Sequence, residues 1–127
     1  MNITIEKTRN DGDKTYVEFS SKYGRSSAVW VAEEPSLGTS YDVEFEIDDD
    51  LVWGETISTT TRDASTIDFT GGLCVIVGRV ISLEKDGCLA IALGDNVILL
   101  DVEQVPKDVS GLVECHASQV KLYPTNL

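Results

Sequence analysis

Apolar and polar residues alternate along much of the chain. A period of two is typical of a β-strand with one buried and one solvent-facing side. The clearest case is segment 41–48, in which Tyr, Val, Phe and Ile alternate with four carboxylates. The same rule places Val17 and Phe19 on one face of segment 14–21. No stretch of about ten residues keeps the 3.6-residue apolar period of an amphipathic helix. We therefore predict an all-β protein with no substantial helix.

Turn residues divide the chain into short strands. Asp86-Gly87 and Gly94-Asp95 favour tight hairpins, and Gly54 indicates a bend within an apolar, β-branched stretch. The predicted strands cover residues 3–6, 14–21, 26–32, 41–48, 51–61, 66–70, 73–83, 89–93, 97–102, 111–115 and 119–123. This pattern predicts a single composite β-barrel or sandwich over residues 1–127, built of roughly nine to eleven short antiparallel strands.

The second half of the chain has a recognisable layout. A long strand interrupted by Gly78 is followed by two hairpins, a longer connection and two final strands. This layout is similar to the OB-fold, a small Greek-key barrel whose first strand bends to serve both sheets. The resemblance covers residues 72–123 and implies an OB-like C-terminal half, although an SH3-like barrel would give much the same pattern. The alternative division is an N-terminal β-sheet in residues 1–64 and an OB-like barrel in residues 72–127.

The net charge limits the classes of partner molecule that we expect. The chain carries 22 acidic and 10 basic residues, a net charge of −12, and has no Lys or Arg between Arg25 and Arg62. A negative surface repels phosphate backbones and speeds encounter with cationic molecules. We therefore expect a basic protein partner rather than a nucleic acid. The candidate partner-binding residues are Glu33, Glu34, Asp42, Glu44, Glu46, Asp48, Asp49, Asp50 and Trp53. The alternative is a solvated face that keeps the protein soluble, compensated across strands by Lys14, Lys22 or Arg25.

No catalytic or metal-binding signature is visible. His116 is the only histidine, and in a strand its side chain points away from that of Cys115, so the two do not form a nucleophile–base pair. Asp48-Asp49-Asp50 lacks the spacing of a calcium loop. Gly71-Gly72 precedes a strand, whereas a phosphate-binding loop precedes a helix. We expect no enzymatic activity, no metal and no cofactor.

The cysteines and the apolar runs suggest a compartment. Cys74, Cys88 and Cys115 are an odd number of widely spaced residues, which favours reduced thiols in a cytoplasmic protein over a Cys88–Cys115 disulfide. No apolar run approaches the roughly 18 residues of a membrane span. The first residues also lack the pattern of a secretory signal. We expect a cytoplasmic protein that does not bind membranes, and its oligomeric state stays open.

These observations favour a non-enzymatic acidic protein that docks on a basic protein. An immunity-type inhibitor of a cationic toxin is one protein of this kind, and it would fit the size and the acidity. The alternatives are an OB-like module for nucleotides or single-stranded nucleic acid, an enzyme whose site the sequence hides, and an interaction or structural module of another role.

Overall fold

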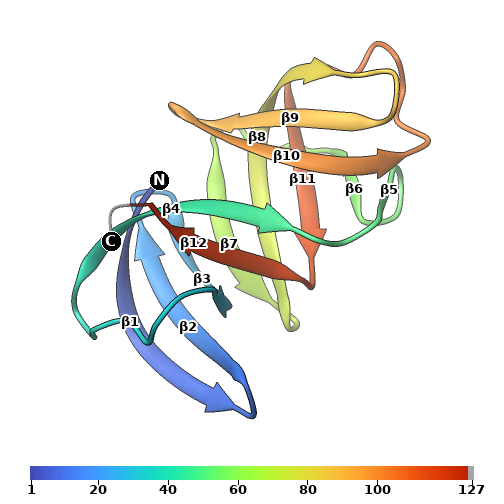
Figure 1. Cartoon of the computed structure of the whole chain (residues 1–127). Coiled ribbons are helices and arrows are strands. Elements are labelled where there is room, and N and C mark those ends of the chain that lie inside the picture. Colours follow the sequence, from blue (N-terminus) through green and yellow to red (C-terminus); the bar gives the residue numbers. More distant parts are fainter. Residues whose placement is uncertain (126–127) are drawn as a thin grey trace.

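The computed structural model describes residues 1–125, which fold into strands joined by turns and loops (Figure 1). The strands are β1 (Asn2–Asp11), β2 (Lys14–Ser21), β3 (Gly24–Trp30), β4 (Ser40–Ile47), β5 (Leu51–Val52), β6 (Ile57–Thr59), β7 (Thr66–Thr70), β8 (Leu73–Leu83), β9 (Cys88–Leu93), β10 (Asn96–Glu103), β11 (Leu112–Ala117) and β12 (Val120–Pro124). The predicted all-β class is confirmed, and no helix occurs in these residues. Most pairings are antiparallel, but β3–β7, β3–β12 and β5–β10 are parallel.

Five strands form a closed barrel. Its order is β12-β4-β1-β2-β3, and β3 then pairs with β12 to complete the ring. The strand that closes it comes from the other end of the chain (Figure 1). Leu122 of β12 is opposite Phe45 of β4 on one side and opposite Trp30 of β3 on the other. The four N-terminal strands therefore share their barrel with β12, which fills the place between β3 and β4.

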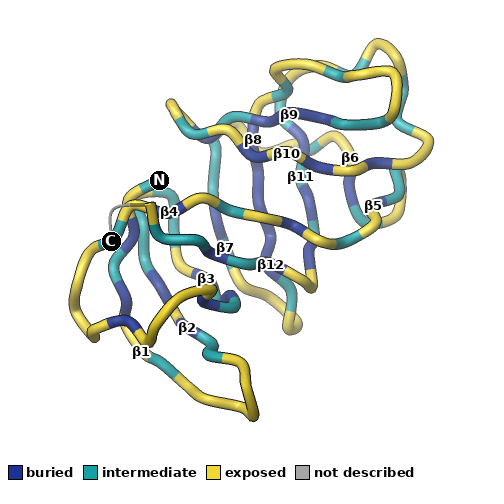
Figure 2. The backbone as a smooth tube through the Cα atoms, viewed as in Figure 1, coloured by how far each residue is buried: buried dark blue, intermediate teal, exposed yellow. Residues whose placement is uncertain are grey.

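The interior of this barrel follows the predicted alternation. Val17 and Phe19 are buried, and the ring of Phe19 meets that of Phe45 edge to face with 5.8 Å between centroids. The sequence did not decide which face of β3 points inward; the structure buries Ser26, Ala28 and Trp30. Buried positions recur at every second residue along β2, β3 and β12, and Figure 2 shows more and less buried stretches alternating along the strands. Alternation of large apolar side chains is thus the main reason that these segments form the barrel wall.

The remaining strands form a second group, which continues the sheet from the barrel through the β3–β7 pair. The long strand β8 pairs with β7, β9 and β11, while β10 pairs with β9 and with β5. β6 pairs with β11, and a single bridge between Trp53 and Ile57 links β5 to β6. The turn at Gly54 is where the sequence placed a bend. The expected OB-like arrangement of residues 72–123 has no support, because β12 leaves this group of strands and pairs with β3 and β4 instead.

One glycine allows the close contact between β3 and β7, which joins the two groups of strands. Gly24, the first residue of β3, pairs with Ile67 of β7 and has a positive φ of 137°. A Cβ atom at this position would collide with the carbonyl oxygen of Ile67. The Ile67 amide donates a 2.9 Å hydrogen bond to the carbonyl of Tyr23. Only a residue without a side chain lets the two backbones approach this closely.

The barrel-closing role of β12 predicts the effect of one substitution. Leu122 is fully buried, so Leu122→Ala should lower the free energy of unfolding by about 2–5 kcal/mol, measured by urea denaturation. Leu37→Ala is the matched control, since Leu37 is 62% exposed, and should change the stability by less than about 0.5 kcal/mol. Equal effects of the two substitutions would contradict the position of β12.

Candidate functional site: an acidic row beside an open strand edge

The acidic segment forms β4 and alternates as expected. Val43 and Ile47 are buried and Phe45 is half-buried. The carboxylates Asp42, Glu44, Glu46 and Asp48 are exposed on the other side, and we call these four the acidic row. This row runs along the outer surface of the closed barrel, and β4 and β12 lie side by side beneath it (Figure 1).

The two ends of the acidic row are partly neutralised. The N-terminal ammonium of Met1 lies 3.0 Å from Asp42, and Lys121 of β12 lies 2.8 Å from Asp48. The hydrogen bond from the N-terminal ammonium lowers the pKa of Asp42, and the one from Lys121 lowers the pKa of Asp48. The compensation expected from Lys14, Lys22 or Arg25 is therefore supplied by other groups. Four carboxylates and two cations leave a local charge of −2.

The middle of the row stays more open. Glu46 interacts with Tyr123 of β12 and with Asp48. Glu44 is exposed, and within residues 1–125 no hydrogen bond or ion pair of its side chain is found. Glu44 is thus the carboxylate of the row that is best placed to meet an external cation.

The other predicted site residues do not join this row. Asp49 accepts hydrogen bonds from the backbone of Ser118 and Gln119 at 2.9 and 2.7 Å, so it anchors the turn between β11 and β12. Glu34 accepts a 3.1 Å hydrogen bond from Asn10 beside the β1–β2 turn. Trp53 is half-buried against the core.

Two further candidates lie in exposed segments. Glu33 is exposed in the same loop as Glu34, and its carbonyl accepts a 2.8 Å hydrogen bond from the Trp30 indole. Asp50 is exposed just before β5. The nine candidates are therefore dispersed, and only the acidic row forms a continuous surface.

The exposed apolar side chains of β10 lie next to the acidic row. In β10 the side chains of Val97 and Leu99 are 55% and 60% exposed, while Ile98 and Leu100 are buried. β4 and β10 are joined through β5, which follows β4 in the chain and pairs in parallel with the end of β10. Nearer the start of β10 the two strands do not pair, and a groove of about 390 Å³ lies between them. We call this groove the notch; residues 42–45 and 95–98 form its two sides.

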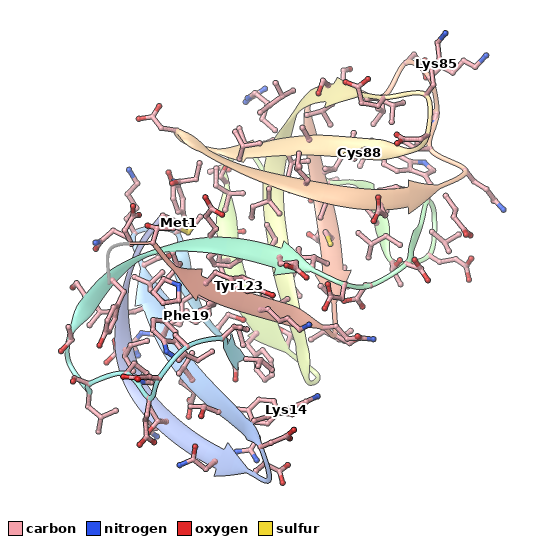
Figure 3. The ribbon with its side chains drawn as sticks, viewed as in Figure 1. Met1, Lys14, Phe19, Lys85, Cys88 and Tyr123 are labelled. Atoms are coloured by element: carbon pink, nitrogen blue, oxygen red, sulfur yellow. The ribbon has the colours of Figure 1, made fainter. Side chains whose placement is uncertain are left out.

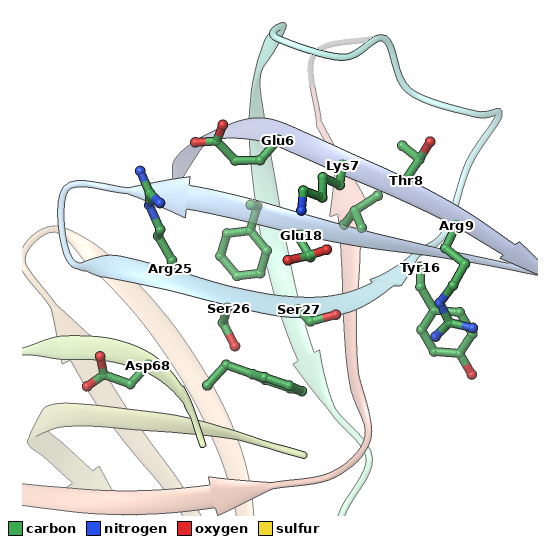
Figure 4. Close-up of a pocket in the computed structure, with 13 residues that line it drawn as sticks. Glu6, Lys7, Thr8, Arg9, Tyr16, Glu18, Arg25, Ser26, Ser27 and Asp68 are labelled. Carbon is green, nitrogen blue, oxygen red and sulfur yellow. The ribbon is translucent and has the colours of Figure 1, made fainter. Parts of the chain in front are cut away.

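A larger open groove of about 830 Å³ lies on the outer face of β1, β2 and β3, next to β7 (Figure 4). Three of the ten basic residues line it, namely Lys7, Arg9 and Arg25. Three carboxylates also line it, those of Glu6, Glu18 and Asp68. The guanidinium of Arg9 lies 4.5 Å from the centre of the Tyr16 ring, and Phe69 is 49% exposed. The groove is thus formally neutral in a strongly negative protein.

The histidine belongs to a surface network. His116 Nε2 lies 2.8 Å from Glu114, and the same carboxylate receives Arg62 at 3.2 Å. The hydrogen bond with His116 lowers the pKa of Glu114, and the nearby charge of Arg62 adds to the effect. His116 and Glu114 line neither the notch nor the larger groove, and Cys115 between them is buried, as the strand pattern predicts.

The cysteines are free thiols in the described chain. Burial raises the pKa of Cys74 to about 11 and that of Cys115 to about 12. Cys88 is half-exposed, and it lies in β9 rather than beside Cys115 in β11. These thiols are poor nucleophiles near neutral pH, because the thiolate is the reactive form.

Metal and membrane features can be stated for residues 1–125. No group of three or more His, Cys, Asp or Glu side chains there is arranged to hold a metal ion. The carboxylates of Asp48 and Asp49 turn to different partners, Lys121 and the Ser118–Gln119 turn. No helix in this part of the chain is long and apolar enough to cross a membrane.

Comparison of the chain with protein-family models, with curated proteins and with solved structures gives no significant match.

Sequence reasoning did not predict the exposed apolar side chains of β10. Residues 97–100 read Val-Ile-Leu-Leu, a continuous apolar run that indicates burial on both faces. The structure buries one face only. The acidic residues Asp101 and Glu103, which alternate with Leu100 and Val102, were the signal that one face of this strand meets solvent.

The Glu114 network predicts a pH dependence. A carboxyl group whose pKa is lowered by folding stabilises the protein above its ordinary pKa, and this contribution is lost as the pH falls through the lowered value. Glu114→Gln should therefore reduce stability by about 1 kcal/mol at pH 7 and make the decline between about pH 5 and pH 3 shallower. Urea unfolding at several pH values measures this. Glu18→Gln, at an exposed position of β2, is the control. Parallel profiles for Glu114→Gln and the original chain would contradict the network.

Proposed function

We propose that this chain is a non-enzymatic binding protein that docks on a basic protein partner through the acidic row of β4. The observation that supports this proposal most is the exposed carboxylate of Glu44 at the centre of the row, beside the exposed Val97 and Leu99 of β10. Carboxylates around an apolar centre are a common composition of protein interfaces, in which charge steers the encounter and apolar contacts hold the complex.

The surface matches a cationic partner better than an anionic one. The residues that line the notch include Asp42, Glu44 and Asp95 but no Lys or Arg. The N-terminal ammonium, which also lies there, is already bound to Asp42 and to the carbonyl of Val43. A net charge of −12 adds a long-range attraction for basic proteins that weakens as salt is added.

An immunity-type inhibitor of a cationic toxin is the form of this function that we propose first. Its support is indirect: a small, acidic chain with an exposed charged surface. Co-expression tests it. The chain should protect a cell from a basic toxin encoded next to its gene. Failure to protect, together with failure to bind that toxin, would exclude this form.

A charge reversal tests the general proposal. Glu44→Lys should weaken capture of basic proteins on the immobilised chain by about tenfold at low salt, because it removes an attractive charge and adds a repulsive one. Glu84→Lys is the matched control: it changes the net charge equally, but Glu84 lies in the β8–β9 turn and is exposed. Equal losses for both variants would mean that only the overall charge matters. No loss for Glu44→Lys would contradict docking through the acidic row.

A second candidate function comes from the larger groove. Arg9 stacked on Tyr16, together with the exposed Phe69, offers cationic and aromatic contacts of the kind that bind a nucleotide or single-stranded nucleic acid. The three carboxylates in the same groove oppose a phosphate. Retention on a single-stranded DNA resin at moderate salt, lost in Arg9→Ala, would favour this function over the first.

A further inference from the structure

The free edge of β10 is a second feature of the proposed docking surface. The two-residue turn Gly94-Asp95 joins Leu93 to Asn96, which are opposite each other in the antiparallel β9–β10 pair. Hydrogen-bonded and non-hydrogen-bonded pairs alternate along such a ladder. Counting from the turn, the backbone groups of Ile98 face β9, whereas those of Val97 and Leu99 face away from it.

No strand of the described chain covers these outward groups. β5 pairs with β10 only at Val102 and Glu103. On the other side of the notch, the Val43 amide bonds to the carbonyl of Met1, whereas the Asp48 amide bonds to Gln119 of the β11–β12 turn. The backbone N–H and C=O groups of the odd-numbered residues of β4 therefore point away from β12. Phe45 lies beyond the end of β1, so its backbone groups also face the notch.

Most proteins protect such an edge. Lysine, proline or a bulge on an edge strand prevents pairing with other chains. β10 contains no Lys and no Pro, its pairing with β9 is regular, and it exposes Val97 and Leu99. Its backbone donors and acceptors can therefore be satisfied by an additional strand.

The acidic residues on and beside β10 determine which kind of strand can pair with it. If β10 paired antiparallel with the β10 of a second copy, in a register centred on Ile98 or Leu99, Asp95 would be opposite Asp101 or Glu103, respectively. Like charges opposite each other destabilise a sheet. A partner strand with alternating basic and apolar side chains instead places its cations on the outer face of the sheet, near Glu44, Asp95 and Asp101, and its apolar side chains on the inner face, against Phe45 and Ile98.

We propose that the free edge of β10 binds an extended segment of a basic protein as an additional β-strand, with alternating basic and apolar residues. This inference rests on the proposed function and specifies its mode of recognition. In such complexes main-chain hydrogen bonds supply affinity, and the alternate side chains supply specificity.

A synthetic heptapeptide of alternating Lys and Val, blocked at both ends, is the probe. Titration into the ¹⁵N-labelled chain should shift the amide resonances of Val97 and Leu99 and slow their hydrogen exchange. The same peptide with alternate backbone amides methylated should bind about tenfold more weakly, because one edge of it can no longer donate hydrogen bonds. Equal affinity of the two peptides would overturn the inference.

Two substitutions at one position separate backbone from side-chain contacts. Leu99→Thr removes the apolar side chain and keeps the outward amide, whereas Leu99→Pro also removes the amide without breaking a hydrogen bond to β9. Leu99→Pro should bind the peptide about tenfold more weakly than Leu99→Thr. If Leu99→Pro does not fold, the methylated peptide decides the question on the unaltered chain.

The outcomes distinguish this inference from the proposed function. If Glu44→Lys weakens binding but the edge amides do not respond, docking through the acidic row stands and strand addition is wrong. If the peptide does not bind at all, strand addition is wrong, and the capture experiment judges the proposed function separately. If the edge amides are already protected and the free chain sediments as a dimer, a second copy occupies the edge, which also overturns the inference.

Discussion

The position of β12 between β3 and β4 is the constraint on which the rest of the structure depends. Without β12, the strands β1 to β4 would form an open sheet whose two edges and inner apolar face met water. With it, Val120 and Leu122 complete the barrel core, and Lys121 reaches Asp48 on the outside. The same strand therefore seals the interior and sets the charge at one end of the acidic row. Asp49 reinforces this arrangement by binding the turn that leads into β12.

The acidic row and the edge of β10 are neighbours because of chain continuity. β4 runs through Asp48–Asp50 into β5, and β5 pairs with the end of β10. This short parallel pair brings the two strands together at one end, and the notch lies where they are unpaired. Figure 3 labels Tyr123 on β12 and Met1 at the chain end, and both lie next to β4. Charge and unsatisfied backbone groups thus occur in one region, which is why we treat them as one surface.

The local alternation of apolar and polar residues predicted the positions of several strands correctly. The alternation in residues 14–21 and 41–48 correctly gave the buried faces of β2 and β4, and the segments 66–70 and 73–83 coincide with β7 and β8. Pairing partners could not be derived in this way. Nothing in the sequence of β12 distinguishes a strand that completes a C-terminal barrel from one that closes an N-terminal barrel, because both require alternating apolar residues. The parallel pairs β3–β12 and β3–β7 depend on such long-range choices. The neutralisation of Asp42 and Asp48 was hidden for the same reason, since their cations come from distant positions.

The late arrival of β12 also bears on how the protein is made. A ribosome delivers β1 to β4 first, and more than half of the chain must follow before residues 120–124 emerge. During that interval the N-terminal strands carry Phe19, Val43 and other core side chains without their final cover, together with two open strand edges. Such transient exposure is a recognised hazard for aggregation and slow folding in β-proteins of high contact order. The strong negative charge of β4 is present in this intermediate too, and mutual repulsion between nascent chains would keep them apart until the barrel closes.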